Sequence, residues 1–383
     1  MSEWKEYKLG DACTELSDGL HKAPIFVKGG DYIFVNAKNI AKGYIVDNDP
    51  TKKSTYEEYL KYLSPLNDTT ILYSIDGTIG NIALYRGEKC ILGKGACYMN
   101  PNPQILDRMF LYYTLQSPHF NAYIDQMSTG STIQHISLKT MRNYVLTCPP
   151  LDEQKQIASI LSSLDDKIDL LNRENATLEA MAETLFRQWF IEEAKEDWEE
   201  KPLSSIATFL NGLACQKYPP KNDIDKLPVL KIRELTNGIG ADSDWAKTDV
   251  GEEYVVHSGD VVFAWSASLM VKIWDGGDCI LNQHLFRVTS TTYPKWFYYL
   301  WCKHYLNEFI VIAQSHATTM GHIKRNDLDT AMVFVPSSEE MKIMSEALEP
   351  IFSKLENNNT QLVSLRTQRD TLLPKLMSNE ISV

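Results

Sequence analysis

The sequence predicts an α+β fold in which two similar mixed α/β domains are separated by two long antiparallel helices forming a coiled coil, with a pseudo-two-fold internal repeat. Three observations lead to this prediction. A heptad pattern runs through residues 149–190, the same spacing recurs 187 residues later, and the segment before each pattern carries the same order of motifs.

The first long helix is predicted within residues 149–190. Two prolines precede Asp152, Glu153 and Gln154, and this order favours the positive end of a helix dipole. Apolar residues then recur in alternating steps of four and three, as in a coiled-coil seam. The seam residues are Ile157, Leu161, Leu164, Ile168, Leu171, Asn175, Leu178, Ala182, Leu185 and Trp189, so Asn175 is the only polar member. The segment is too charged to span a membrane.

The second long helix is predicted at residues 339–373. Adding 187 to the first seam gives Met344, Leu348, Ile351, Leu355, Asn358, Leu362, Leu365, Arg369, Leu372 and Leu376. An antiparallel register that pairs Leu161 with Leu372 places Asn175 opposite Asn358. The two amides then satisfy each other, or one or both point to solvent at a helix edge. Pro374 is expected to end or kink the helix, so Leu376 is not expected to pair with Ile157.

The two globular segments repeat one order of elements. Residues 32–43 and 227–238 are predicted strands that lead into polar loops, and residues 69–85 predict a hairpin echoed by 260–269. In the first segment, residues 110–127 predict one helix or two short helices around Pro118. The predicted domains are residues 1–150, 151–196, 197–336 and 337–383.

Composition limits the possible functions. The net charge of −12 is divided as 0, −6, −4 and −2 over these four segments in order, which counts against autonomous, tight, non-specific DNA binding. The seven cysteines are odd in number and form no CxxC pair, so reduced thiols are expected and a metal site is not. Residues 1–9 lack the character of a signal peptide, and no apolar run approaches the length of a membrane span. A cytoplasmic location is therefore expected.

Catalytic motifs are incomplete. Residues 100–103 (NPNP) approach the base-holding motif of a methyltransferase, but the second proline is displaced and no aromatic residue follows. Residues 87–94 (GEKCILGK) have five residues between the glycines of a phosphate loop instead of four, and Gly95 stands where Ser or Thr is required. No nucleophile has a plausible general base at readable spacing. The chain is therefore expected not to be an enzyme.

Several segments resemble the specificity subunits of type I restriction–modification systems. They are residues 149–169 (PPLDEQKQIASILSSLDDKID), 185–190 (LFRQWF), 372–381 (LLPKLMSNEI), 76–80 (DGTIG) and 128–136 (STGSTIQHI). The resemblance covers the whole chain in the order target-recognition domain, spacer helix, target-recognition domain, spacer helix. The second half departs from the pattern, because WSASLM (265–270) lacks the glycines of DGTIG. Loop geometry is therefore not expected to carry over between the halves.

The resemblance implies a sequence-specific DNA-recognition subunit. Each domain is expected to read one half of a bipartite, asymmetric target, with half-sites about one helical turn, roughly 10 bp, apart. The helices act as a spacer ruler and as docking surface, to which Ile160, Leu170, Phe186 and Phe190 are expected to contribute. The implied partners are double-stranded DNA, two modification (methyltransferase) subunits that use S-adenosylmethionine to methylate adenine N6, and restriction subunits that use ATP. This chain is expected to hold no cofactor, and alone to bind DNA weakly.

Candidate DNA-contacting residues lie in polar loops at equivalent places in the repeat. Hydroxyl, amide and basic side chains suit contacts with phosphates and base edges. In the first block they are Lys38, Asn39, Ser74, Thr78, Lys94, Ser131, Thr132, Gln134, His135 and Lys139. In the second block they are Lys231, Arg233, Ser266, Ser268, Gln283, His284, Thr318, Thr319, His322, Lys324 and Arg325. For any one of them, the alternative is a capping, packing or solvated loop residue.

Two other functions remain open on the sequence. The acidic balance suits a coiled-coil scaffold or inhibitor whose two blocks bind proteins instead of DNA. An autonomous DNA-modifying enzyme is the third hypothesis, and the missing motifs count against it.

Overall fold

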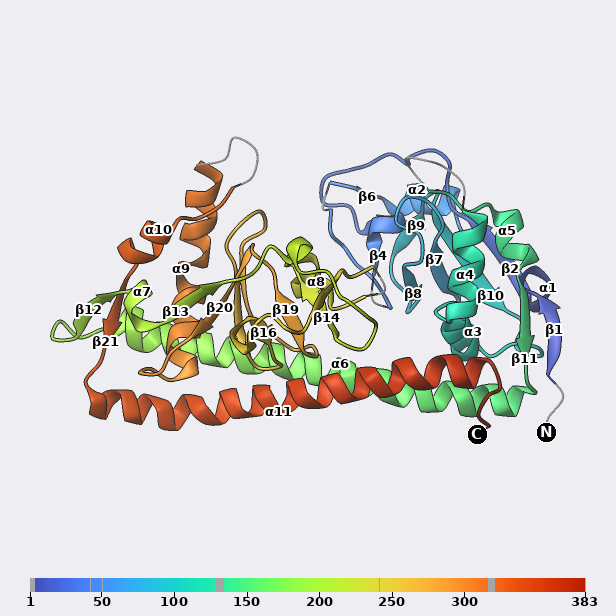
Figure 1. Ribbon diagram of the computed structural model, residues 1–383. Coiled ribbons are helices and arrows are strands. Elements are labelled where there is room, and N and C mark those ends of the chain that lie inside the picture. The colour runs from blue at the N-terminus through green and yellow to red at the C-terminus, as the bar shows by residue number, and fades with distance from the viewer. Residues whose placement is uncertain are drawn as a thin grey trace. The chain divides into compact units, whose positions relative to one another are not determined.

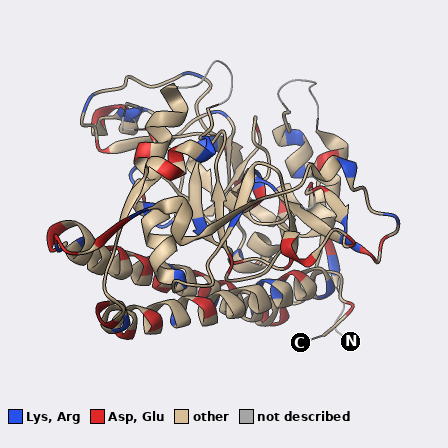
Figure 2. Cartoon of the chain, turned by 60° about the vertical axis from the view of Figure 1, so that its left-hand side comes forward, with Lys and Arg blue, Asp and Glu red and all other residues tan. Residues whose placement is uncertain are grey.

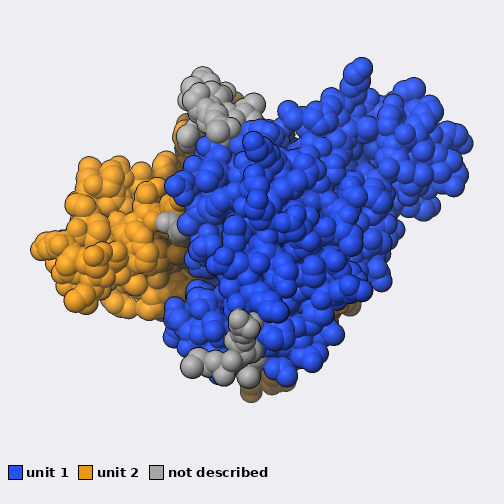
Figure 3. Space-filling view, turned by 90° about the vertical axis from the view of Figure 1, so that its right-hand side faces the viewer, with its two compact units in different colours: residues 1–166, 368–383 blue, residues 167–367 orange. Residues whose placement is uncertain are grey.

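A computed structural model describes residues 4–41, 43–49, 51–128, 134–240, 242–315 and 321–382 (Figure 1). The chain divides into two compact units (Figure 3). Unit 1 comprises Met1–Asp166 and Gln368–Val383, and unit 2 comprises Lys167–Thr367. Each unit holds one sheet-containing part and a length of both long helices, so neither long helix is a separate body. The predicted α+β fold class is confirmed.

Unit 1 begins with strands and short helices that precede the first long helix. In chain order they are β1 (Lys5–Lys8), α1 (Leu9–Ala12), β2 (Cys13–Asp18), β3 (Tyr32–Val35), the 3-10 turn η1 (Ala37–Asn39), β4 (Ile40–Ala41), β5 (Tyr44–Ile45), β6 (Lys53–Ser54), α2 (Tyr56–Lys61), β7 (Ile71–Ser74), β8 (Ile82–Leu84), β9 (Cys90–Leu92), β10 (Ala96–Pro101), α3 (Arg108–Thr114), α4 (Pro118–Met127), α5 (Leu138–Asn143) and β11 (Val145–Cys148).

Unit 2 has a closely similar series. Its elements are β12 (Glu199–Pro202), α7 (Leu203–Ile206), β13 (Thr208–Asn211), η3 (Cys215–Lys217), β14 (Lys226–Leu230), α8 (Ile232–Asn237), β15 (Trp245–Lys247), η4 (Glu252–Tyr254), β16 (Val255–Val256), β17 (Val261–Ala264), β18 (Met270–Ile273), β19 (Cys279–Leu281), β20 (Leu285–Thr289), α9 (Lys295–Ser315), α10 (Arg325–Thr330) and β21 (Met332–Val335).

The sequence repeat is also a repeat of topology. The sheet ordered β2-β10-β7-β8 in unit 1 corresponds to β13-β20-β17-β18 in unit 2, and both are antiparallel throughout. The sheet β6-β3-β9 corresponds to the first three strands of the sheet β15-β14-β19-β16, with a parallel pair at β3–β9 and at β14–β19. The pair β1–β11 corresponds to β12–β21. Corresponding strand ends therefore bring corresponding loops together within each unit.

One helical region differs between the units for a local reason. In unit 1, Ser117 caps α4 by accepting a hydrogen bond from the backbone N–H of Phe120, and Pro118 occupies the first turn. The chain therefore breaks into α3 and α4, as one of the two sequence expectations had it. Unit 2 has no proline within the corresponding stretch, and α9 is a single helix of 21 residues. Its aromatic side chains, among them Trp296, Phe297 and Trp301, fill the core of unit 2.

The long helices are α6 (Leu151–Arg187), which a π-helical turn extends over Gln188–Glu192, and α11 (Ser338–Met377). In unit 1, Ile157 and Leu161 of α6 share a core with Leu372 and Leu376 of α11. Within unit 2, the apolar cluster of Ile168, Leu171, Leu362 and Leu365 also joins the two helices. In each unit, residues with higher numbers on α6 lie beside residues with lower numbers on α11, so the helices run antiparallel. No helix in the described ranges is long and apolar enough to cross a bilayer.

The expectation that the second long helix ends at Pro374 is wrong. The helix α11 continues to Met377, and Leu376, which is 2% exposed, belongs to the same core as Ile157. A proline removes one backbone donor, but the backbone N–H of Ser378 still bonds the Pro374 carbonyl at 3.0 Å. The burial of Leu376 in the core of unit 1 stabilises this last turn.

The polar seam residues form a hydrogen-bonded layer within unit 2. Nδ2 of Asn358 donates to Oδ1 of Asn175 at 2.8 Å and to Oε2 of Glu174 at 2.9 Å, while Nδ2 of Asn175 donates to Oδ1 of Asn359 at 2.8 Å. Asn358 is fully buried. The observed register is therefore the one with Asn175 opposite Asn358. Asn359 is an additional partner, which is not one of the predicted seam residues.

The first prediction concerns the coupling of these amides. Replacing Asn175 or Asn358 with Ala should each lower the free energy of unfolding by about 1–3 kcal/mol, because each change leaves a buried polar group without its partner. The double variant should cost less than the two single costs added together. Urea titration of the full chain measures all three. Asn357→Ala, at an exposed position beside the layer, is the control and should change stability by less than about 0.5 kcal/mol. Additive costs would contradict the pairing.

A histidine in unit 2 lies between two carboxylates. His257 Nδ1 lies 2.8 Å from Oδ1 of Asp278, and its Nε2 lies 3.0 Å from Oε1 of Glu252. Both ring nitrogens carry a proton only in the imidazolium form, so this arrangement favours the charged ring. The hydrogen bond to Asp278, followed by that to Glu252, raises the pKa of His257 above its ordinary value.

The second prediction follows from the sign of that shift. Because the folded-state pKa of His257 is raised, its stabilising effect is complete below its unfolded pKa of about 6.5 and is lost as pH rises through the folded pKa. His257→Gln should therefore destabilise the chain more at pH 6 than at pH 8.5, as measured by thermal unfolding. Asp278→Asn removes the carboxylate that raises the pKa of His257 most, and it should reduce the same pH dependence. Equal destabilisation at both pH values would contradict the charged bridge.

Candidate nucleic-acid interface

Three segments of unit 1 meet at one edge of its four-stranded sheet, called here edge 1: residues 74–81 between β7 and β8, residues 93–95 between β9 and β10, and residues 134–136. The backbone N–H of Ile75 donates to the Gly95 carbonyl at 2.9 Å, and that of Ile136 donates to the Ile75 carbonyl at 2.9 Å. The N–H of Gly77 donates to the Gln134 carbonyl at 3.0 Å. These bonds hold the turn against both neighbouring segments without using side chains.

Unit 2 has the same arrangement at edge 2: residues 264–270, 282–284 and 321–323. Here the N–H of Trp265 donates to the His284 carbonyl at 3.3 Å, that of Ile323 to the Trp265 carbonyl at 3.1 Å, and that of Ala267 to the Gly321 carbonyl at 2.8 Å. Short bridges complete the match, Asp76 with His135 and Ser266 with His322. The bonds set up four correspondences: Asp76 with Ser266, Gly77 with Ala267, Lys94 with Gln283, and His135 with His322.

The two turns share a backbone conformation despite different sequences. Gly77 has φ of +72°, and Ala267, at the matching place, has φ of +58°. The expectation that loop geometry would not carry over from DGTIG to WSASLM is therefore corrected at this position. Alanine in the left-handed region is strained by roughly 1–2 kcal/mol. The backbone bond from Ala267 to Gly321 and the two beside it fix the turn in this conformation.

Edge 1 carries paired charges. Nζ of Lys94 lies 3.6 Å from Oδ2 of Asp76, and Nδ1 of His135 lies 3.6 Å from Oδ1 of the same carboxylate. The side chains of Lys94 and His135 are 49% and 40% exposed, so solvent or a ligand reaches them. Gly95 is required at its position, because a Cβ there would stand 2.9 Å from the Cβ of Asp76.

Edge 2 is neutral and aromatic at the same places. Oγ of Ser266 and Nδ1 of His284 lie 3.0 Å apart, and Nε1 of Trp265 donates to Oδ1 of Asn211 at 3.1 Å. The Trp265 ring is half-buried and has its centroid 6.1 Å from that of His284. Nδ2 of Asn282 donates to Oε1 of Gln283 at 2.9 Å and so orients that amide. The two edges thus offer different side-chain chemistry on one backbone plan.

Comparison with known proteins shows the family to which this sequence belongs. A family model described as the type I restriction modification DNA specificity domain matches residues 1–180 and again residues 195–366. The chain belongs to this family. It is therefore the DNA specificity subunit of a type I restriction–modification system, part of a complex that binds DNA, and is not itself catalytic. The cofactors of such a complex reside on its modification and restriction subunits.

Individual relatives agree. The MjaIX specificity subunit of a type I restriction enzyme from Methanocaldococcus jannaschii is 24% identical over 384 residues, covering 93% of this chain and 88% of that protein. The HindI specificity subunit from Haemophilus influenzae is 26% identical over 201 residues, covering 50% of this chain and 42% of that one. The crystal structure of an S subunit from M. genitalium shares the fold, with a TM-score of 0.57 at 16% identity, covering 98% of this chain and 96% of that one.

The first-block candidates fall into four groups, and the half-buried His135 is the single member of one of them. The exposed ones are Lys38, Thr78, Lys94, Gln134 and Lys139. Asn39 and Ser74 are buried and hold loops instead: Asn39 accepts a hydrogen bond from the Asn36 N–H at 3.1 Å, and Ser74 Oγ bonds the Thr78 carbonyl at 2.6 Å. Ser131 and Thr132 lie outside the described residues. The edge itself brings together Lys94, Thr78, Gln134 and His135.

The second-block candidates divide similarly. Ser268, Lys324 and Arg325 are exposed, and Gln283, His284 and His322 are half-buried at edge 2. Three are already engaged within the unit: Ser266 is 4% exposed beside His284, Lys231 pairs with Asp244, and Arg233 binds Oε1 of Glu234 at 2.7 Å. Thr318 and Thr319 lie outside the described residues.

Sequence reasoning missed Asp76 and Trp265. Trp265 directly follows the buried strand β17, and Asp76 is the second residue after the buried strand β7. Aligning the two halves strand by strand pairs Asp76 with the selected Ser266, and this signal was available. Trp265 gave no such signal, because its counterpart is the fully apolar Ile75.

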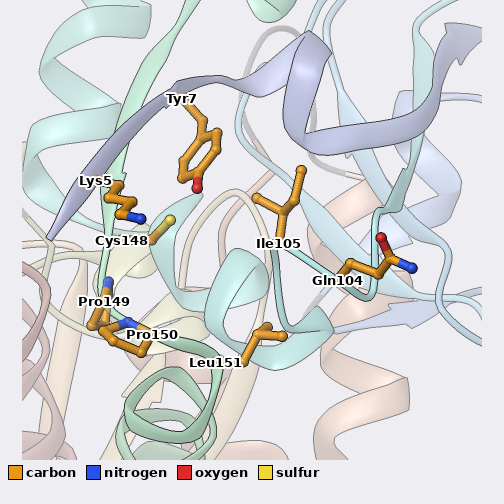
Figure 4. Close-up of a pocket in the computed structure, with 8 residues that line it drawn as sticks. All are labelled: Lys5, Tyr7, Gln104, Ile105, Cys148, Pro149, Pro150 and Leu151. Carbon is orange, nitrogen blue, oxygen red and sulfur yellow. The ribbon is translucent and has the colours of Figure 1, made fainter.

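A pocket of about 220 Å³ lies elsewhere in unit 1, and Tyr7, Ile105 and Cys148 face it beside the start of α6 (Figure 4). It includes none of the candidate DNA contacts. All seven cysteines are buried, and burial raises the pKa of the Cys13 thiol to about 12, so this thiol is not poised as a nucleophile. Within the described residues, no group of three or more His, Cys, Asp or Glu is placed to hold a metal ion.

The third prediction tests the strained turn of edge 2. Ala267→Gly should keep or raise the free energy of unfolding, by up to about 1 kcal/mol, because glycine adopts the positive φ without strain. The matched change in unit 1, Gly77→Ala, should lower it by about 1 kcal/mol, since it introduces that strain. Chemical denaturation of both variants of the specificity subunit gives the comparison. A clear loss of stability in Ala267→Gly would mean that the alanine methyl group, and not the backbone bonds, holds the turn.

Proposed function

We propose that each compact unit of this specificity subunit reads one half of a bipartite, asymmetric DNA target through its edge, 1 or 2. The observation that carries the proposal is the match of backbone hydrogen bonds at the two edges, which present different polar side chains from equivalent positions. Base-reading groups must reach into a groove from a fixed frame, and backbone bonds supply such a frame. Exposed Lys139 in unit 1, and Lys324 and Arg325 in unit 2, are assigned to phosphate contacts.

We assign the long helices two roles, that of a ruler for the separation of the half-sites and that of docking surface for two modification subunits. In support, apolar side chains face solvent along α6: Ile160 is 39% exposed in unit 1, and Leu170 and Met181 are 49% and 50% exposed in unit 2. The expectation that Phe186 and Phe190 contribute to the docking surface is wrong, because both side chains are buried. They are 4% and 0% exposed and pack against Trp301 in the core of unit 2.

The negative net charge of the chain is consistent with a need for partner subunits in DNA binding. Figure 2 shows Asp and Glu along both long helices, and the segment 151–196 alone has a net charge of −6. DNA binding needs positive charge to displace counterions from phosphates. The modification subunits are the proposed source of most of it, and restriction subunits that use ATP complete the proposed complex. Membership in a DNA specificity family leaves the protein-binding scaffold hypothesis without support.

The fourth prediction is a unit exchange. Residues 1–148 are replaced by the corresponding block of another specificity subunit, together with the donor's equivalents of Ile157, Leu161 and Leu376, which belong to the same core. The chimera is expressed with this system's own modification subunits, and methylated sites are mapped across the genome. One half-site should change, while the other half-site and their separation should stay the same.

The matched control replaces residues 197–336, again with the core partners from α6 and α11, and should change the opposite half-site only. A chimera that methylates the original bipartite sequence would contradict one-unit-one-half-site reading. A changed separation with the helices intact would contradict the ruler role alone.

A further inference from the structure

We propose that Lys94 and Asp76 of edge 1 together read one G·C base pair, Lys94 donating to guanine O6 and N7 and Asp76 accepting from cytosine N4. This inference rests on the proposed function, because it assigns particular bases to a surface proposed to face the major groove. It also makes Asp76, an acidic residue, a direct reader of DNA.

The two groups are held side by side by the fold. Asp76 is the second residue after β7, where the backbone bonds of Ile75 and Gly77 fix its position. Lys94 lies in the next segment of the edge, where its N–H donates to the Leu20 carbonyl at 2.6 Å. The side chains end 3.6 Å apart and are 49% and 29% exposed for Lys94 and Asp76. His135 approaches the other carboxylate oxygen, so Oδ2 is the one directed at Lys94.

This spacing matches the major-groove edge of a G·C pair. Guanine O6 and cytosine N4 are hydrogen-bonded to each other, so they lie about 2.9 Å apart. One is an acceptor and the other a donor. A cation and an anion separated by 3.6 Å meet such a pair with the correct order of charge, each side chain addressing one base.

An A·T pair also presents a donor beside an acceptor, but it fits less well. On adenine, the N6 donor is adjacent to the N7 acceptor, which repels a carboxylate, whereas nothing on cytosine opposes Asp76 at N4. On thymine, a lysine finds the single acceptor O4 next to a methyl group, whereas guanine offers both O6 and N7. Both differences favour G·C, with guanine on the lysine side.

Breaking the ion pair on binding costs little, because a pair of charges this exposed contributes at most about 1 kcal/mol. Edge 2 has the same backbone hydrogen bonds, with uncharged side chains at the two matching positions. There Gln283 stands for Lys94 and the buried Ser266 stands for Asp76. Lys94→Gln therefore gives edge 1 the side chain that the fold already accommodates at the matching place, and it should not disturb folding.

The experiment uses the full chain assembled with its modification subunits. Binding is measured against duplexes in which each base pair of the native target is varied in turn. The native complex should require G·C at one position of the unit 1 half-site, and Lys94→Gln and Asp76→Ala should each reduce discrimination at that same position about tenfold or more. Specificity at every other position should be unchanged.

Two matched variants separate base reading from general attraction. Lys139→Ala, at an exposed lysine on α5 of unit 1, should weaken binding to all duplexes alike. Gln283→Ala should alter a position in the other half-site only. If Lys94→Gln weakens all sequences uniformly, or if its position is not G·C, the base assignment is overturned while the unit exchange still supports half-site reading. If the unit exchange fails as well, the proposed function itself is lost.

Discussion

The register of α6 against α11 is the constraint on which both compact units depend, because each helix supplies core residues to each of them. Ile157 and Leu161 from α6, with Leu376 from α11, lie in the core of unit 1. Phe186 and Phe190 from α6, with Leu348 from α11, lie in that of unit 2. Burying such a side chain contributes about 1.5–3 kcal/mol, so a slip of one heptad would forfeit several of these contributions in both cores.

Leucine pairs alone would not distinguish that register from its neighbours, since every seam layer offers a similar apolar contact. The layer of Asn175, Asn358 and Asn359 does, because a shift by one heptad would face each amide with an apolar side chain and leave buried donors without acceptors. The layer is less favourable than a leucine pair in absolute terms. Its effect is to make the alternatives worse, as polar seam residues do in other coiled coils.

Much of this was readable in the sequence because it follows from spacing. The repeat offset of 187 residues and the antiparallel register both follow from the spacing of the helix seams, and the recurring order of motifs predicted two similar domains. Three features were not readable, because tertiary packing decided them. Leu376 is buried in the core of unit 1, and α11 continues past Pro374. Phe186 and Phe190 pack against the aromatic residues of α9 instead of facing solvent. Backbone bonds hold Ala267 in the conformation of Gly77, although loop geometry was not expected to carry over between the halves.

The same reasoning explains why candidate contacts were harder to select than elements. At edges 1 and 2, the frame consists of backbone N–H and carbonyl groups, which every residue except proline supplies in full. This backbone frame does not depend on the side chains at the matched positions, so Asp76 and Ser266, or Lys94 and Gln283, occupy one place with unrelated chemistry. A site built this way leaves little local sequence signature, and its members are found by comparing the two halves with each other. That freedom is also what a DNA-reading surface requires, because the base specificity of one unit can then change without altering the fold that presents it.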